Sequence, residues 1–173
     1  PPQLKDLNEC ISKYSDKIKI LKGIEIGQGI YRKKETQALL QKYDYDFVLG
    51  SLHNLENMED FFFLDYQKYD IDDLLSKYFD GLLELCQWGA FDSLAHLTYP
   101  LRYIVAREKI EVDMKKYQDV CDAIFEELIK KANCKDYAEF VILLYDIGAL
   151  ACKEGEMERI VEALDDIDSS PDY

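Results

Sequence analysis

The alternation of short apolar strands with amphipathic helices is the feature that most constrains the fold of this 173-residue chain. Three runs rich in Ile, Val, Leu and Phe predict strands at residues 17–27, 47–53 and 91–96. Apolar residues at helical spacing predict helices at residues 3–15, 33–43, about 70–88 and 117–131. Strands that alternate with helices are typical of a parallel sheet covered by helices, so we expect an α/β fold of the barrel type.

The segment between the second strand and the third helix, residues 54–69, is acidic and aromatic. It contains Phe61–Phe63, for which we expect buried packing, with the lining of a substrate pocket as the alternative. Asp70 or Asp72 is the predicted N-cap of the third helix. Gly89 follows its last turn, where glycine commonly ends a helix.

The pattern changes at the C-terminal end of the chain. Residues 137–153 and 154–167 are predicted helices, the second very acidic, and a strand at 140–145 is the alternative for part of the first. We therefore expect two regions: a partial barrel domain over residues 1–132, and a helical acidic tail of unknown role over residues 133–173.

Composition excludes several classes of partner. The formal net charge is −14, so the chain repels nucleic acids and anionic membrane surfaces. An anionic small substrate stays possible, because a bound cation inverts the local field. No apolar run reaches membrane-spanning length, and the five cysteines show neither CxxC nor zinc-finger spacing. These features predict a cytoplasmic protein with reduced thiols and no membrane or nucleic-acid partner; they leave its oligomeric state open.

Metal-ligand side chains stand at the ends of the three predicted strands. Glu25 ends the first, His53 the second and His96 the third, and the chain has no other histidine. Active sites of parallel barrels gather where the strands end, and carboxylate and imidazole are ligands for zinc, manganese and iron. Taken singly, each residue is more often a solvated carboxylate or a hydrogen-bonded histidine. Together they predict a divalent-metal cluster.

Three motifs in series carry a resemblance to a known family. Residues 23–27 read Gly-Ile-Glu-Ile-Gly, residues 46–53 read Asp-Phe-Val-Leu-Gly-Ser-Leu-His, and residues 91–103 contain Ser-Leu-Ala-His-Leu-Thr-Tyr-Pro-Leu-Arg-Tyr. In this order the motifs resemble those of the PHP (polymerase and histidinol phosphatase) superfamily. The residues within each motif are most similar to those of its histidinol-phosphate phosphatases. The resemblance implies a distorted TIM-like (β/α)7-type barrel of about seven strands, with up to three divalent ions (Mn, Zn or Fe) that serve phosphate-ester hydrolysis.

The resemblance also implies roles for single residues. Glu25, His53 and His96 are expected to be metal ligands, with no further catalytic residue beyond them. Arg102 is a candidate phosphate clamp, because a guanidinium matches phosphate in a bidentate fork; a surface arginine is the alternative. Ser51 and Asn54 are candidate substrate contacts, and shaping of the turn is the alternative.

The sequence also departs from the family pattern. The family's first strand carries His-x-His and a late strand carries Asp-x-His, and neither motif is present. We therefore expect an incomplete barrel. The favoured hypothesis is a histidinol phosphatase in the full-length form, which converts L-histidinol phosphate and water into L-histidinol and phosphate. The alternatives are a catalytically incomplete fragment or degenerate scaffold, and a PHP phosphatase with another phosphoester substrate.

Overall fold

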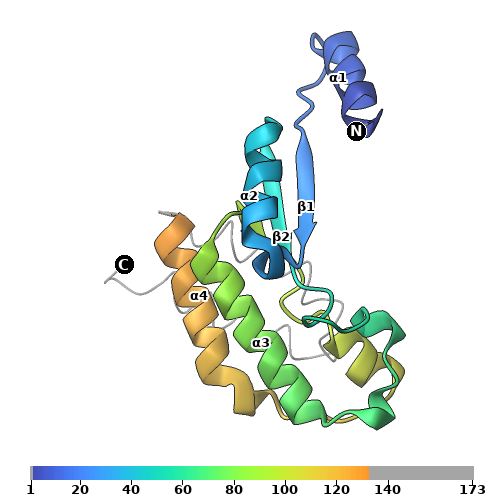
Figure 1. The fold of residues 1–173 in the computed structure, drawn as a ribbon, viewed down its shortest axis with the longest axis vertical. Helices are drawn as coiled ribbons and strands as arrows, with labels where there is room; N and C mark the ends of the chain where they lie inside the picture. The colour runs from blue at the N-terminus through green and yellow to red at the C-terminus, as the bar shows by residue number, and fades with distance from the viewer. Residues whose placement is uncertain (1, 133–173) are drawn as a thin grey trace. The chain divides into compact units, whose positions relative to one another are not determined.

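The computed structural model describes residues 2–132, and the predicted tail at 133–173 lies outside them. Helices and strands alternate along the described residues, as the sequence predicts (Figure 1). The elements are α1 (Pro2–Tyr14), β1 (Gly23–Gly27), α2 (Lys33–Lys42), β2 (Phe47–Ser51), α3 (Ile71–Trp88), β3 (Ser93–Leu94) and α4 (Gln118–Ala132). The proposed division between a barrel domain and a tail stays a prediction.

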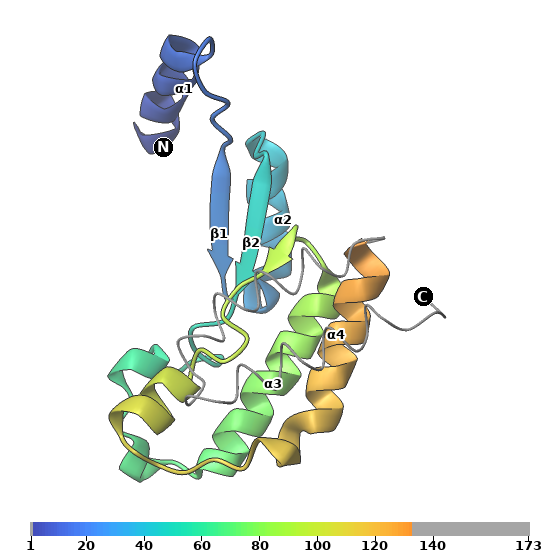
Figure 2. The same cartoon turned by 180° about the vertical axis from the view of Figure 1, so that it is seen from behind.

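The three strands form one parallel sheet in the order β1-β2-β3. Two aspartates, one just before β2 and one just before β3, accept hydrogen bonds from the backbone of the neighbouring strand region. Asp46 accepts the backbone N–H of Lys22 at 2.7 Å, and Asp92 accepts that of Val48 at 2.7 Å. Because the strands are parallel and in register, their carboxyl ends meet at one edge, where the arrowheads of β1 and β2 point in Figures 1 and 2.

The α/β class with a small parallel sheet agrees with the prediction, but the structure does not confirm the predicted incomplete barrel. Among the described residues the sheet has three strands. Each new strand is added beside the previous one, which is the order of a barrel; a doubly wound sheet reverses its order part-way. The (β/α)7-type barrel therefore stays a prediction.

The predicted strands are longer than those observed. Gly23 is the first residue of β1 because its register partner, Phe47, is the first residue of β2. Upstream, Ile18 and Leu21 are 59% and 51% exposed. Alternating isoleucines favour a strand, but extended backbone also needs a neighbouring strand to accept its hydrogen bonds.

Helix α3 supplies much of the core of the described unit. Asp70 is its N-cap and accepts the Asp73 N–H at 3.1 Å, while Gly89 ends it with a left-handed φ of 61°. These ends match the prediction. The apolar face is buried as the spacing predicts, with Leu74, Leu75, Tyr78, Phe79, Leu82, Leu85 and Cys86 all inaccessible or nearly so. Helix α4 lies beside α3 in both views (Figures 1 and 2), and Tyr117 packs on Phe79 with ring centroids 5.2 Å apart.

The segment after β3 contains a helical stretch that the sequence analysis did not predict. Residues Arg102–Arg107 form a π-helical turn, in which the Glu108 N–H donates to the Tyr103 carbonyl at 2.9 Å. Pro100 stands just before it, and its carbonyl accepts from both Tyr103 and Ile104. Proline at the start of a helical turn loses no hydrogen bond, because its missing N–H has no partner there.

The expectation for the Phe61–Phe63 run needs correction. Phe61 is fully buried, but Phe62 and Phe63 are 51% and 69% exposed, so the run is not simply buried packing.

Cys10 is exposed on α1, whereas Cys86 is buried on α3. None of the helices within residues 2–132 is both long and apolar enough to cross a membrane.

Candidate metal centre

Three candidate ligands come together at the carboxyl edge of the sheet. Glu25 lies in β1, His53 follows β2 and His96 follows β3. One donor atom from each lies within 4.8 Å of the others. Glu25 Oε1 is 3.0 Å from His53 Nε2 and 3.5 Å from His96 Nε2. Parallel strands in register thus bring together residues that are 28 and 43 positions apart in the sequence.

Hydrogen bonds to the backbone hold the strand ends in place. The Gln28 N–H donates to the Ser51 carbonyl at 3.0 Å and the Phe61 N–H to the His53 carbonyl at 2.9 Å. The buried Tyr78 hydroxyl donates to the His96 carbonyl at 2.6 Å. Gln28 and His96 have left-handed backbones, with φ of 57° and 58°. Such conformations are uncommon outside glycine and persist where the surroundings fix them.

The electrostatic surroundings favour a neutral His96. Burial is the largest cause and lowers the pKa of its imidazole below the usual value; His53 and Arg102 lower it further, while the Glu25 carboxylate opposes them. Desolvation disfavours the protonated form, and a neutral imidazole keeps the lone pair that a metal needs. His96 is therefore suited to ligation near neutral pH.

The donor chemistry fits a divalent ion. One carboxylate oxygen and two imidazole nitrogens form the ligand set that leaves a position open in catalytic zinc sites, and manganese and iron accept the same atoms. The side chains of Glu25, His53 and His96 are 37%, 26% and 31% exposed, so solvent or a substrate can reach the donors. These three residues form the candidate metal centre of the described chain.

The other predicted site residues are Ser51, Asn54 and Arg102. Each lies within six positions of His53 or His96 in the sequence, but each side chain contacts a partner outside the ligand cluster. The buried Ser51 Oγ donates to the Ile26 carbonyl at 3.5 Å, which favours the alternative that it shapes the strand end. Asn54 donates to the carbonyl of the next residue, Leu55, at 2.9 Å, also as a turn residue does. The exposed Arg102 guanidinium lies 5.9 Å from the centre of the Tyr99 ring. Within residues 2–132 it has no ion-pair partner.

Tyr99 and Asp60 also belong to the site, although the sequence did not predict a role for either. The Tyr99 ring packs on both imidazoles, and its hydroxyl donates to Asp60 Oδ1 at 3.0 Å. Burial, followed by hydrogen bonding with Tyr103 and Asp60, raises the pKa of the Tyr99 phenol, so it stays a donor near neutral pH. The spacing of Tyr99 three residues after His96 is a weak signal, whereas the contact with Asp60, 39 positions away, has none.

Arg107 is a further missed residue, and it anchors the aromatic connection rather than binding a ligand. Its Nη1 donates to the Phe62 carbonyl at 2.7 Å, and Nε pairs with Glu108 at 2.7 Å. The guanidinium also lies 5.3 Å from the ring centre of Tyr103. The π-helical turn is thereby fastened to the connection that carries Asp60.

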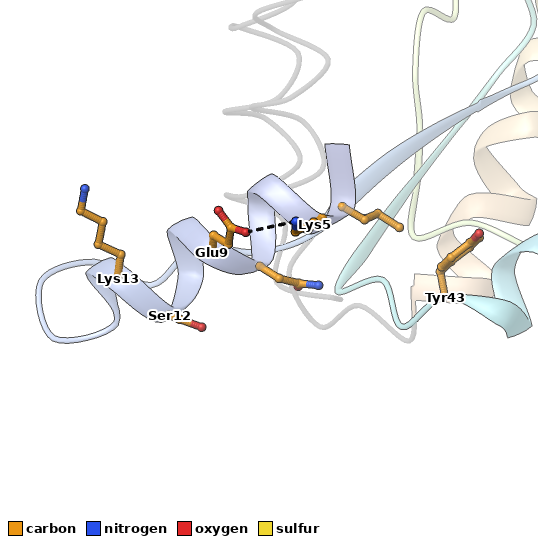
Figure 3. A pocket seen from close by; sticks show the side chains of 7 residues that line it. Lys5, Glu9, Ser12, Lys13 and Tyr43 are labelled. Carbon is orange, nitrogen blue, oxygen red and sulfur yellow. Dashed lines mark ion pairs between the residues drawn. The ribbon is translucent and has the colours of Figure 1, made fainter. Parts of the chain in front are cut away.

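A separate hollow lies beside α1 and carries no comparable chemistry (Figure 3). Its labelled side chains include the exposed ion pair of Lys5 and Glu9 at 3.9 Å, together with Tyr43. An exposed pair of this kind contributes little stability and selects no ligand. The candidate metal centre remains the chemically distinctive site.

Comparison with known proteins decides the family. The PHP domain model matches residues 3–138, most of the chain and all three candidate ligands. The chain belongs to the PHP domain family. The resemblance predicted from the three strand-end motifs is therefore confirmed.

Similar PHP proteins include three bacterial relatives. A probable histidinol-phosphatase of Clostridium acetobutylicum is 29% identical over 138 residues, 73% of this chain and 54% of the relative. The histidinol-phosphatase of Lactococcus lactis is 25% identical over 148 residues, 84% of this chain and 54% of the relative. A probable histidinol-phosphatase of Deinococcus radiodurans is 23% identical over 108 residues, 60% of this chain and 41% of the relative. This PHP chain thus spans about half the length of the curated relatives it matches.

Proposed function

We propose that this chain supplies part of the metal site of a PHP-type phosphomonoesterase whose substrate, in the complete protein, is L-histidinol phosphate. The observation that carries the proposal is the convergence of Glu25, His53 and His96 at the ends of three parallel strands. The names of the three relatives support the substrate, a small phosphorylated metabolite. A cytoplasmic location and the absence of nucleic-acid and membrane partners stay predictions.

The proposed roles follow from donor chemistry. Glu25, His53 and His96 hold divalent ions, with Mn, Zn and Fe as the candidates. A bound divalent ion supplies Lewis acidity toward phosphoryl oxygens and lowers the pKa of a bound water. Because both histidines of the chain lie in this cluster, neither is left to activate a serine nucleophile. Direct attack by water is therefore the favoured reaction.

Arg102 is the proposed phosphate contact. Its guanidinium lies against Tyr99, whose ring touches both imidazoles, and its charge is felt at His96. A guanidinium without an ion-pair partner within the described residues is available for a bidentate phosphate contact. Ser51 and Asn54 remain weaker candidates, because their side chains donate hydrogen bonds to backbone carbonyls.

A second candidate function is a catalytically incomplete chain that binds metal without turnover. The specific observation is that the chain spans 54% of the two most similar relatives reported above. Three protein ligands suffice for one ion, whereas a site for up to three ions needs further donors. Under this alternative the chain binds metal at the cluster but releases no phosphate.

A phosphate-release assay tests the proposal. The full chain is loaded with Mn²⁺, Zn²⁺ or Fe²⁺ and incubated with L-histidinol phosphate, phosphotyrosine or p-nitrophenyl phosphate. The proposal predicts metal-dependent release with the highest kcat/KM for L-histidinol phosphate, and loss of release with EDTA. Metal binding without release supports the incomplete chain; a preference for another ester supports the third hypothesis. Release that survives EDTA contradicts the proposal.

The Arg102→Ala variant sharpens the assay. Loss of a phosphate contact made equally in the bound substrate and the transition state raises KM and leaves kcat near its original value. Lys130→Ala, which removes an exposed positive charge on α4 that is paired with Glu127, is the control. Equal sensitivity to inorganic phosphate in the Arg102 variant and the original chain would count against the clamp.

A further inference from the structure

Tyr99 contacts both histidines of the candidate metal centre. Its ring centroid is 4.8 Å from that of His53 and 5.6 Å from that of His96, with interplanar angles of 45° and 51°. The two imidazoles are themselves 5.3 Å apart. Aromatic rings at these separations make directional contacts, so the three rings restrain one another.

A hydrogen-bonded circuit fixes Tyr99 in turn. Its hydroxyl donates to Asp60 Oδ1 at 3.0 Å, and the same oxygen accepts the Phe62 N–H at 2.8 Å. The next residue along from Asp60, Phe61, donates its N–H to the His53 carbonyl at 2.9 Å. The connection between β2 and α3 thus holds the His53 backbone and, through Asp60 and Tyr99, its side chain.

Ring contact matters here because the outer imidazole nitrogens lack hydrogen-bond partners. Metal-binding histidines usually donate the other ring N–H to a carboxylate or carbonyl, which fixes the ring orientation. Within residues 2–132 no hydrogen bond reaches Nδ1 of His53 or His96. His53 Nδ1 faces Gly27, which has no side chain that could accept its hydrogen bond; a Cβ at this position would lie 3.6 Å from the nitrogen. Glu25 contacts the inner Nε2 atoms of both rings, and the Tyr99 ring is a second contact that the two imidazoles share.

We propose that Tyr99 is a positioning residue that sets the orientation of both candidate ligand imidazoles, and that Asp60 holds Tyr99 in place. The inference rests on the proposed metal site for its consequence, which is tight divalent-ion binding. It also has a consequence without metal: the two imidazole rings are restrained in the free chain.

The metal-free consequence is tested by NMR. The chain contains two histidines, so its imidazole C–H resonances report on this cluster alone. In Tyr99→Leu, which removes the ring, we expect both histidines to shift and to broaden as the rings gain alternative orientations. Tyr99→Phe keeps the ring and should give shifts closer to those of the original chain. Tyr66→Phe is the matched control, because Tyr66 donates to the Phe61 carbonyl at 2.8 Å, and within residues 2–132 its ring makes no ring contact with either imidazole.

The metal consequence is tested by titration with Co²⁺, whose visible absorption reports coordination geometry. Tyr99→Leu should bind about 10-fold more weakly or worse, in line with the loss seen when groups that orient ligands are removed. Its spectrum should also change shape, which a general loss of stability would not produce. Tyr99→Phe should lie between, and Tyr66→Phe should match the original chain.

The two arms separate this inference from the proposed function. If the original chain binds no Co²⁺ but Tyr99→Leu broadens both histidines and Tyr66→Phe does not, the metal site fails and the positioning role stands. If the original chain binds Co²⁺ and Tyr99→Leu leaves affinity, spectrum and linewidths unchanged, the positioning role is refuted while the metal site stands. Equal changes in Tyr99→Leu and Tyr66→Phe also refute it.

Discussion

Helix α3 and the carboxyl edge of the sheet are built from different kinds of contact. The buried face of α3 is apolar, regular and closed to solvent, with Leu75, Phe79 and Leu82 inaccessible. At the sheet edge the ligand side chains are about one-third exposed, and hydrogen bonds to carbonyls and ring contacts hold the backbone and the imidazoles in place. Two residues there have left-handed backbones. Stability therefore resides mainly in the helical core. At the sheet edge the chain leaves regular structure, and this irregular backbone places the candidate metal donors.

The largest effect is expected from a cavity in the core. Phe79 is fully buried and packs on Tyr78 and Tyr117. Phe79→Ala should lower the free energy of unfolding by about 3–5 kcal/mol, measured by urea denaturation of the metal-free chain. Under conditions where the variant is folded, its metal stoichiometry should match that of the original chain. A loss below about 1 kcal/mol would break the assignment of stability to this face.

A smaller effect is expected where the two regions meet. Tyr78 buries its ring on the apolar face of α3 and donates its hydroxyl to the His96 carbonyl at 2.6 Å. Tyr78→Phe keeps the ring, so its cost should be about 0.5–1.5 kcal/mol, the net worth of one hydrogen bond. The His96 carbonyl still accepts from the Tyr99 N–H at 3.0 Å, which limits the loss.

The His96 imidazole resonance and the metal affinity distinguish Tyr78→Phe from Phe79→Ala. Tyr78→Phe should shift the His96 imidazole resonance and weaken metal binding, unlike Phe79→Ala. If Tyr78→Phe changed stability and left His96 and metal affinity untouched, the hydroxyl would belong to the core alone.

An effect of similar size on stability, with none on metal binding, is expected at the start of α3. The Asp70 carboxylate accepts the Asp73 N–H at 3.1 Å as an N-cap. Asp70→Ala should cost about 1 kcal/mol, and Asp70→Asn or Asp70→Ser should restore most of it, because each offers a capping oxygen. Thermal unfolding measures both, and metal affinity should not change. Loss of metal binding in Asp70→Ala would contradict the separation of the two regions.

The sequence was sufficient to predict the order of the main helices and strands and the convergence of the three candidate ligands, for different reasons. Both ends of α3 were predicted from local signals, Asp70 at its start and Gly89 at its end, because each of these residues acts within one turn. Glu25, His53 and His96 followed from topology, since parallel strands bring their carboxyl ends together whatever the intervening loops do. Both inferences need only the order and type of the elements.

The contacts that the sequence did not predict depend on the path of the loops. Tyr99 meets Asp60 only because residues 54–69 fold back over the strand ends, a route that no periodicity specifies. The π-helical turn at Arg102–Arg107 has no repeat long enough to signal it. Strand lengths were overestimated because pairing, more than composition, sets where a strand begins.

The central claim is that Glu25, His53 and His96 form one metal-binding cluster. The most direct test is the amount of metal per chain, measured by elemental analysis after incubation with Mn²⁺, Zn²⁺ or Fe²⁺ and desalting. Glu84→Gln, an exposed carboxylate paired with Lys33, is the control for Glu25→Gln. The account predicts at least one ion per original chain and per Glu84→Gln chain, and loss of most of it in Glu25→Gln and His53→Ala. No metal above background in the original chain, or equal stoichiometry in all four proteins, would contradict it.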